Sequence, residues 1–183
     1  VAGRDEVDDI AKKLTDHKKA RNVYNVSPSI SPDGGKIAFL TNNLSYFDID
    51  LIDAVTGKKI KKLIKGSRSL DFEELKFLQP GISWSPDSER IVFAAKSGSG
   101  DALYIVNVDS EEKEKIPFEL DGVFSAVWSP LGDKLAFVGY EKGASDIYIY
   151  DINKKEHYNL TNDIYSDSEP SWSPDGNLIA FTV

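Results

Sequence analysis

Hydrophobic and polar positions alternate in short blocks along most of this chain. Four apolar triplets each stand six residues after a serine: Ile37-Ala38-Phe39, Ile91-Val92-Phe93, Leu135-Ala136-Phe137 and Ile179-Ala180-Phe181. Those serines open four copies of one polar pattern: Ser31-Pro32-Asp33-Gly34, Ser85-Pro86-Asp87-Ser88, Ser129-Pro130-Leu131-Gly132 and Ser173-Pro174-Asp175-Gly176. Proline presets the backbone of an early turn position, and glycine tolerates a positive φ at the exit. The pattern therefore predicts four turns, each leading into a strand.

The four copies begin 54, 44 and 44 residues apart, a spacing that is typical of β-propeller blades. The third copy predicts four strands rich in β-branched and aromatic residues, at 126–128, 135–140, 146–151 and 157–161. Four antiparallel strands make one blade. We therefore expect an all-β chain, a single partial β-propeller over 1–183. Its full blades span about 27–66, 80–120 and 124–162, a further blade opens at 170–183, and both ends carry partial blades.

Two segments fall outside the repeat. Val7, Ile10, Ala11 and Leu14 have helical spacing, whereas Leu14-Thr15-Asp16 resembles an outer strand end, Leu160-Thr161-Asn162. An N-terminal outer strand or a short helix at 5–16 is therefore expected, with the strand favoured. The first interval is also ten residues longer than the others. The excess falls in Ser67–Pro80, where residues 70–78 predict a short amphipathic helix or a long loop.

Tryptophans recur at one place in the repeat, at Trp84, Trp128 and Trp172, with Ile30 in the first copy. A large aromatic side chain at a fixed repeat position is best explained by packing between neighbouring blades. We therefore assign these residues to the core and not to a ligand site.

The composition excludes several classes of function. Thirty acidic and 22 basic side chains give a net charge of −8, which argues against nucleic acid and anionic membranes as partners. No apolar stretch approaches the roughly 20 residues that cross a bilayer, so membrane insertion is not expected. The absence of cysteine excludes disulfides and thiol chemistry. Since the chain begins at Val1 and ends inside a repeat, we expect a piece of a longer protein.

Catalytic motifs are not found. Ser97-Gly98-Ser99-Gly100 lacks the spacing of a nucleophile elbow, and there is neither an H-E-x-x-H zinc helix nor a P-loop. The two histidines, His17 and His157, lie in polar segments near repeat ends. We therefore expect no catalytic residues and no cofactor.

Several acidic side chains are candidate ligands for a hard cation. Strand alternation puts Asp48 and Asp50 on one face and Asp53 on the other, so this trio is interpreted as a solvated strand face. Asp167 and Glu169 would suit a cation or acid–base chemistry, but their place before an inner strand favours the rim of the axial funnel. No metal site is expected.

That funnel rim is the candidate binding site. Equivalent positions before each inner strand are Asn25, Gln79, Val123 and Asp167, and neighbouring aromatic residues add the kind of surface that anchors protein contacts. The alternative is that these aromatic side chains pack between blades. The candidate rim residues are Tyr24, Asn25, Gln79, Phe124, Tyr165, Asp167 and Glu169.

The string from Glu169 to Phe181, EPSWSPDGNLIAF, resembles the repeat of TolB-type, WD-like β-propellers. The segments Asp146–Asp151 and Asn159–Asn162 complete the resemblance. The resemblance covers about residues 24–183. Departures are Ile30 for tryptophan, Ser88 for glycine and Leu131 for aspartate. An arginine common in the loop between the second and third strands of the family is not evident at Lys96, Gly98, Glu141 or Gly143, so these loops are not assumed to bind the family's ligands.

The resemblance implies a non-catalytic scaffold that binds a protein or peptide partner through inter-blade loops and the axial funnel. It also implies a periplasmic or otherwise extracytoplasmic location. An alternative is an accessory, gating propeller domain of a larger peptidase, because tricorn-like and prolyl-oligopeptidase-like peptidases carry such propellers. A weaker third hypothesis is a propeller that binds carbohydrate or another small ligand. Exposed blade edges further suggest self-association.

Overall fold

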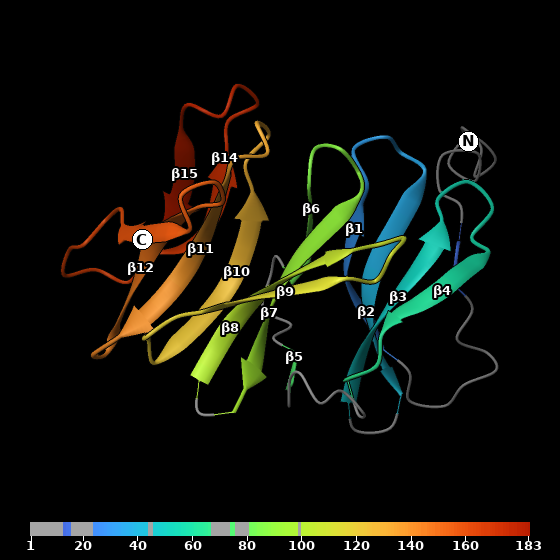
Figure 1. The fold of residues 1–183 in the computed structure, drawn as a ribbon, viewed down its shortest axis with the longest axis horizontal. Helices are drawn as coiled ribbons and strands as arrows, with labels where there is room; N and C mark the ends of the chain where they lie inside the picture. Colours follow the sequence, from blue (N-terminus) through green and yellow to red (C-terminus); the bar gives the residue numbers. More distant parts are fainter. Residues whose placement is uncertain (1–12, 16–23, 44–45, 67–73, 76–80, 99) are drawn as a thin grey trace, which may run out of the picture.

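The chain forms four antiparallel sheets that follow one another in sequence and stand side by side, from blue to red in Figure 1. The computed structural model describes residues 13–15, 24–43, 46–66, 74–75, 81–98 and 100–183. No α-helix occurs among these residues, and so none of them forms a helix long enough to cross a membrane. The predicted all-β, blade-by-blade architecture is confirmed.

The first and third sheets each contain four strands in simple up-and-down order. The first comprises β1 (Asn25–Ile30), β2 (Lys36–Asn43), β3 (Tyr46–Asp53) and β4 (Lys59–Ile64). The third comprises β10 (Gly122–Trp128), β11 (Lys134–Glu141), β12 (Ala144–Asp151) and β13 (Glu156–Asn159). The fourth sheet has two strands, β14 (Ser168–Trp172) and β15 (Ile179–Thr182).

The second sheet has a divided inner edge. It contains β5 (Glu74–Leu75), β6 (Ser83–Trp84), β7 (Arg90–Ser97), β8 (Gly100–Asn107) and β9 (Lys113–Pro117). Both β5 and β6 pair with β7. The only described part of the expected helix or loop at 70–78 is therefore a short strand. Leu75 lies opposite Ala95, as Val123 lies opposite Gly139, so Leu75 takes the inner-strand position that the sequence spacing gave to Gln79.

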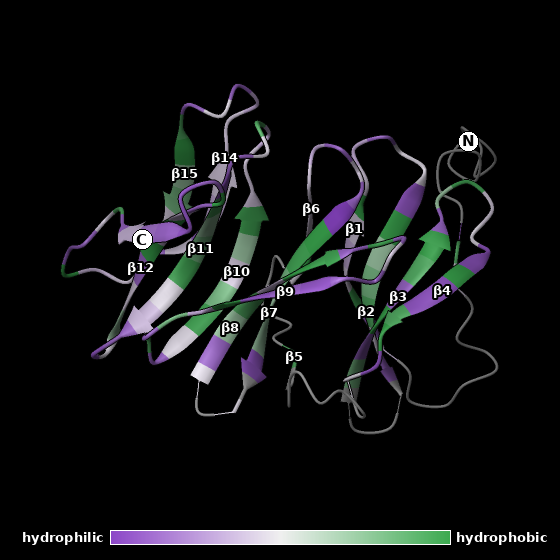
Figure 2. Ribbon diagram, in the orientation of Figure 1, coloured by the Kyte–Doolittle hydropathy of each residue, from purple (hydrophilic) through white to green (hydrophobic). Residues whose placement is uncertain are grey.

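The hydrophobic core of the described residues consists of three clusters, one at each junction between neighbouring sheets. Strand alternation divides the middle strands between two clusters: on β7, Phe93 packs toward the first sheet and Val92 toward the third. On β11, Phe137 and Ala136 divide in the same way. Figure 2 shows these central strands as predominantly hydrophobic and the turns as hydrophilic. Each sheet is therefore stabilised through its neighbours.

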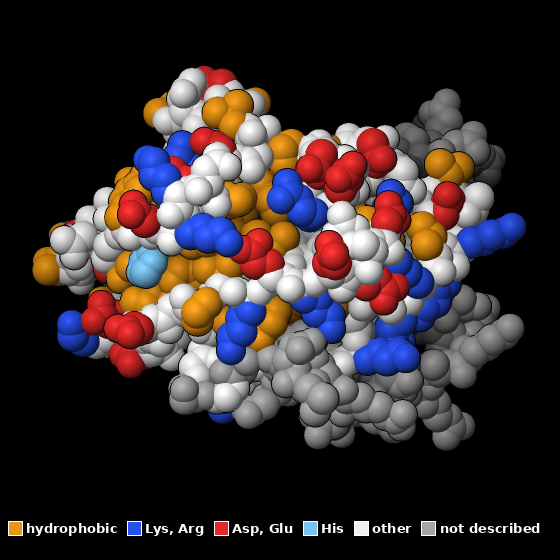
Figure 3. All heavy atoms as spheres, in the orientation of Figure 1, with side chains coloured by type: hydrophobic (Ala, Val, Ile, Leu, Met, Phe, Trp, Pro, Cys, Tyr) orange, Lys and Arg blue, Asp and Glu red, His pale blue; other side chains and the backbone are white. Residues whose placement is uncertain are grey.

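Charged side chains cover the outside. In Figure 3, acidic and basic side chains are interspersed over the visible face, with apolar side chains showing between them around β10. Both signs of charge thus share a solvated surface, although acidic residues are in excess over the whole chain.

The tryptophans pack at the blade junctions, as predicted. Trp84 and Trp128 are buried in the first and second clusters, and Trp172 packs against the third. Trp84 Nε1 donates a hydrogen bond to the carbonyl of Ser29 at 3.0 Å, on the preceding sheet. Trp172 Nε1 reaches the carbonyl of Val127 in the same way at 3.3 Å.

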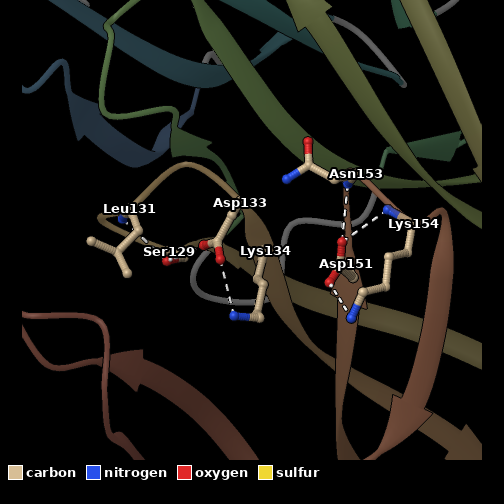
Figure 4. A network of polar contacts seen from close by, with 7 residues as sticks. All are labelled: Ser129, Leu131, Asp133, Lys134, Asp151, Asn153 and Lys154. Carbon is tan, nitrogen blue, oxygen red and sulfur yellow. Dashed lines mark hydrogen bonds and ion pairs between the residues drawn. The ribbon is translucent and has the colours of Figure 1, made fainter.

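The serine of each turn closes the turn with its hydroxyl group. In the first copy, Ser31 Oγ donates to Asp33 Oδ1 at 2.6 Å and accepts the backbone N–H of Lys36 at 2.9 Å. Where Leu131 replaces the aspartate, Asp133 accepts the Ser129 hydroxyl instead, at 3.2 Å (Figure 4). The departure at Leu131 therefore keeps a carboxylate acceptor for the turn serine.

Ser88 also replaces the usual glycine for a structural reason. It has a positive φ of 63°, like Gly34 at 72°. Its hydroxyl accepts the backbone N–H of Asp33 at 3.1 Å and so links the turns of the first two sheets. Glycine would relieve the strained backbone but would lose this link.

The N-terminal segment is described only at Lys13–Thr15, which form neither a strand nor a helix. The rest of the strand or helix expected at 5–16 lies outside the described residues. The carbonyl oxygen of Leu14 would be 2.8 Å from a Cβ placed on Gly57, so this stretch lies against the β3–β4 hairpin.

Candidate binding site on the inner strands

The inner strand of a sheet is its first strand, and three of the four inner strands carry a bulge at one position. The register of β1, β10 and β14 shifts between Val26 and Ser29, Phe124 and Val127, and Ser168 and Ser171. Inside these bulges Ser27, Ser125 and Glu169 have positive φ values of 51°, 51° and 54°. A left-handed non-glycine residue costs about 1–2 kcal/mol. Its recurrence four residues before three of the four turn serines makes it part of the blade design.

The bulges border a hollow of about 630 Å³. All four sheets contribute to its wall: Ser27, Pro28, Gly81, Ile82, Val127, Glu169, Pro170 and Ser171. A second hollow of about 430 Å³ lies among the serine-proline turns and is lined by residues that include Pro86, Trp128 and Pro174. Val127 and Ser171 line both, so the two hollows adjoin along the inner strands. We call this combined space the inner-strand groove.

The chemistry of the inner-strand groove is mostly neutral. Glu169 is exposed and is the one ionisable side chain among the described residues that line it. Serine hydroxyls, prolines, indole rings, backbone and the aliphatic side chains of Ile82 and Val127 form the rest of the wall. Such a surface suits an extended, largely uncharged segment with one cationic group.

Of the predicted rim residues, the structure places only Glu169 in the wall of the groove. Tyr24 and Tyr165 are 63% and 59% exposed, beside the starts of β1 and β14. Asn25 is half-buried and pairs with Thr41 on β2. Gln79 lies outside the described residues.

Phe124 and Asp167 are positioned differently from the other rim residues. Phe124 is half-buried and packs against the cluster between the third and fourth sheets, as the alternative interpretation of the aromatic residues expected. Asp167 is completely buried, and its carboxylate lies close to those of Asp146 and Asp163.

Sequence reasoning missed Ser27, Pro28, Val127 and Ser171 as groove residues. A signal was available, because Ser27, Gly81, Ser125 and Glu169 each precede a turn serine by four residues. Only the bulge in the strand, which sequence spacing does not show, turns this part of the blade toward the groove.

The interpretation of Asp48 and Asp50 as a solvated face was wrong. Both are nearly buried, with 7% and 9% exposure, because lysines on β4 neutralise them. Asp48 pairs with Lys62, and Asp50 pairs with Lys59 at 2.5 Å. This strand face is therefore an ion-paired surface.

His157, exposed on β13, contacts aromatic rings. Its ring centroid lies 5.1 Å from that of Phe118, in an edge-on arrangement, and 6.4 Å from that of Tyr148. These contacts fit the structural role expected for it. His17 lies outside the described residues.

This architecture is similar to that of known β-propeller proteins. The family model described as the TolB beta propeller domain matches residues 77–183. No curated protein matches the chain. Among solved structures, TolB from Acinetobacter baumannii superposes with a TM-score of 0.71 at 24% identity, over 86% of this chain and 37% of its own length. A putative TolB from Agrobacterium tumefaciens superposes with a TM-score of 0.70 at 20% identity, over 85% of this chain and 52% of its own length.

Peptidases share the fold more distantly. The tricorn protease gives a TM-score of 0.59 at 15% identity, covering 81% of this chain and 14% of the protease. A structure from a study of two prolyl endopeptidases gives a TM-score of 0.60 at 16% identity, covering 88% of this chain and 26% of the endopeptidase chain. The chain thus spans well under two thirds of each of these proteins. Since the family model covers more than half of the chain, the chain belongs to the TolB beta-propeller domain family.

Proposed function

We propose that this chain is a non-catalytic scaffold that binds a protein or peptide segment in the inner-strand groove. The observation that carries the proposal is that all four sheets line one side of the groove with small neutral residues and a single carboxylate. A partner seated there contacts several blades at once. Membership of a family that includes TolB propellers supports this assignment.

Recognition follows from the rigidity of the blades. The inner strands are hydrogen-bonded and packed against neighbouring sheets, so binding does not have to order them. Glu169 attracts a lysine, arginine or free amino group of the partner. Tyr24 and Tyr165, both exposed, are suited to anchor flanking residues of the partner.

The test is to select peptides on the immobilised chain and to measure their affinities by calorimetry. Ser171→Trp fills the groove and should abolish binding, whereas Glu156→Trp on outer strand β13 should leave it unchanged. Glu169→Gln should weaken the binding of cationic peptides by about tenfold, because it removes one charge-assisted hydrogen bond. Peptides that bind the Ser171→Trp chain as tightly as the wild type would reject the proposal.

A second candidate is an accessory domain that gates or positions substrate for a peptidase domain elsewhere in a longer protein. The fold shared with the tricorn protease and prolyl endopeptidases favours it. Sequencing the complete reading frame distinguishes the candidates: a hydrolase elbow or a zinc helix in the flanking sequence decides for the peptidase.

We also propose an extracytoplasmic location and self-association through the free edges. The first proposal rests on family membership alone. The second rests on the apolar side chains at the two ends of the array, where Ile30 is 61% and Leu178 is 70% exposed.

A further inference from the structure

We propose that Asp146, Asp163 and Asp167 bind a hard divalent cation, of the size of calcium, at the junction of the third and fourth sheets. They come from three segments: β12, the connection after β13, and the residue before β14. One carboxylate oxygen of each lies within 4.8 Å of the other two. This proposal does not depend on what occupies the inner-strand groove.

Asp167 carries the argument. It is 0% exposed, and neither carboxylate oxygen has a hydrogen-bond partner in the described part of the chain. Its backbone is fixed, because its N–H donates to the carbonyl of Ser145 at 2.7 Å and its carbonyl accepts the Ser145 hydroxyl at 3.0 Å. A buried carboxylate is costly unless it is paired or coordinates a metal. The structure therefore holds in place an acidic group that lacks its counterpart.

The other two carboxylates are oriented but not neutralised. Asp146 accepts hydrogen bonds from Asn159 Nδ2 at 2.8 Å and Thr161 Oγ1 at 3.2 Å, and Asp163 accepts the N–H of Tyr165 at 2.7 Å. Among the described residues, no lysine or arginine forms an ion pair with any of the three. Three negative charges this close repel one another, and a shared cation relieves that repulsion.

The preceding repeat provides an internal comparison. The residues 44 positions earlier are Ala102, Glu119 and Val123. Ala102 is buried in the cluster between the first and second sheets, and Val123 is buried in the cluster between the second and third. Two of the three equivalent positions therefore carry buried apolar side chains where this repeat has carboxylates. The repeat therefore does not need an acidic triplet to fold, which favours a ligand-binding role for the acids.

The donor set selects the ion. Three carboxylates with no histidine or cysteine suit a hard cation and not zinc or copper. Calcium takes six to eight oxygens in a flexible arrangement, whereas magnesium requires a tight octahedron. Asp163 is exposed, so water can complete the coordination from that side. These features favour calcium over magnesium.

The first test is calorimetric titration of the EDTA-treated chain with calcium chloride. We expect one calcium ion per chain, weaker binding of magnesium, and at least about tenfold weaker calcium binding for both Asp163→Asn and Asp167→Asn. Glu119→Gln, at the equivalent position of the preceding repeat, is the matched control and should bind calcium like the wild type.

Thermal unfolding provides a second readout. Without calcium, Asp167→Asn should melt above the wild type, because it removes a buried charge that has no partner. About 1 mM calcium should raise the melting temperature of the wild type alone. If Asp167→Asn does not fold, Asp163→Asn, which lies on an exposed connection, tests whether the calcium-induced rise in melting temperature is lost. A wild-type chain that binds no calcium, or that binds it no better than Asp163→Asn, would overturn the proposal.

Discussion

At the scale of single residues, the three tryptophans are chemically alike but differ in their hydrogen bonding. The indole N–H groups of Trp84 and Trp172 reach a carbonyl on the preceding sheet, whereas Trp128 Nε1 is buried without a partner among the described residues. The guanidinium of Arg90 lies 4.9 Å from the ring centre of Trp128, a cation–π contact. Trp128 therefore stabilises its junction through packing and ring contacts.

Replacing Trp128 with alanine should lower the free energy of unfolding by about 3–5 kcal/mol, because it empties a buried site between two sheets. Urea unfolding followed by fluorescence measures the loss. Trp172→Ala is the comparison and should cost less, since Trp172 is only partly buried. Equal losses in the two variants would contradict the difference in packing.

The aspartates of the serine turns make stability depend on pH. Hydrogen bonds from the Ser173 hydroxyl and from Asn177 lower the pKa of Asp175 from 3.8 to about 2. Because the folded pKa lies below the unfolded one, this contribution is complete above about pH 4 and is lost as the pH falls through 2. The wild type should melt above Asp175→Asn at pH 5, and the two should converge near pH 2. Melting curves at both pH values measure this, and a constant difference would contradict it.

At the scale of elements, the outer hairpins repeat one turn. Asp53, Asn107 and Asp151 accept backbone N–H groups two and three residues later; for Asp151 these are Asn153 at 3.1 Å and Lys154 at 2.9 Å (Figure 4). Each turn then has a left-handed residue: Gly57, Glu111 or Lys155, with φ of 70°, 62° and 57°. Only the first copy uses the residue that this backbone favours.

Lys155→Gly should therefore raise the free energy of unfolding by about 1 kcal/mol, because glycine adopts the left-handed backbone without steric cost. The exposed ion pair of Lys155 with Glu114, at 3.4 Å, contributes little. Urea unfolding measures the gain, with Lys154→Gly as the control that should not be stabilised. A destabilised Lys155→Gly chain would contradict the assignment of strain to this turn.

At the scale of the whole molecule, the described residues do not close the array of sheets into a ring. The fourth sheet has two strands, and Leu178 and Val183 on or beside it are 70% and 78% exposed. At the other end, Ile30 occupies the tryptophan position of the first sheet and is 61% exposed. Exposed apolar residues beside free strands favour association.

We expect the chain to associate as its concentration rises, and Leu178→Lys with Val183→Lys to reduce this by placing charges at the free edge. Sedimentation velocity over a range of concentrations measures the effect. Glu156→Lys, on an outer strand, controls for added charge alone. A wild-type chain that stays monomeric at every concentration would contradict the expectation.

The repeat architecture could be predicted from the sequence because its signals are local. The turn serine, the apolar triplet and the tryptophan each keep a fixed spacing, and a strand pair joined by a short turn needs little else. The inserted segment was less predictable: Leu75, within it, lies opposite Ala95, a pairing that the repeat spacing did not predict. The spacing of the repeat only counts residues, so it does not show whether the inner strand lies before or after the inserted residues.

The candidate site was only partly predictable, because it depends on contacts between segments. Glu169 was identified, but the bulges beside which Ser27 and Ser171 line the groove arise from a register shift in three dimensions. Asp167 was considered with Glu169, its near neighbour in sequence. Its spatial neighbours are Asp146 and Asp163, from β12 and a loop, and sequence spacing does not bring these three carboxylates together.

The two-faced middle strands imply a gradient of local opening along the array. Backbone amides of β7, β8, β11 and β12 lie in sheets covered on both sides, whereas β15 is an edge strand whose described residues are largely exposed. Exchange of these amides with deuterium should be slowest in the central pair of blades and fastest at the carboxyl end. The order in which the blades lose protection would then report which junction is weakest.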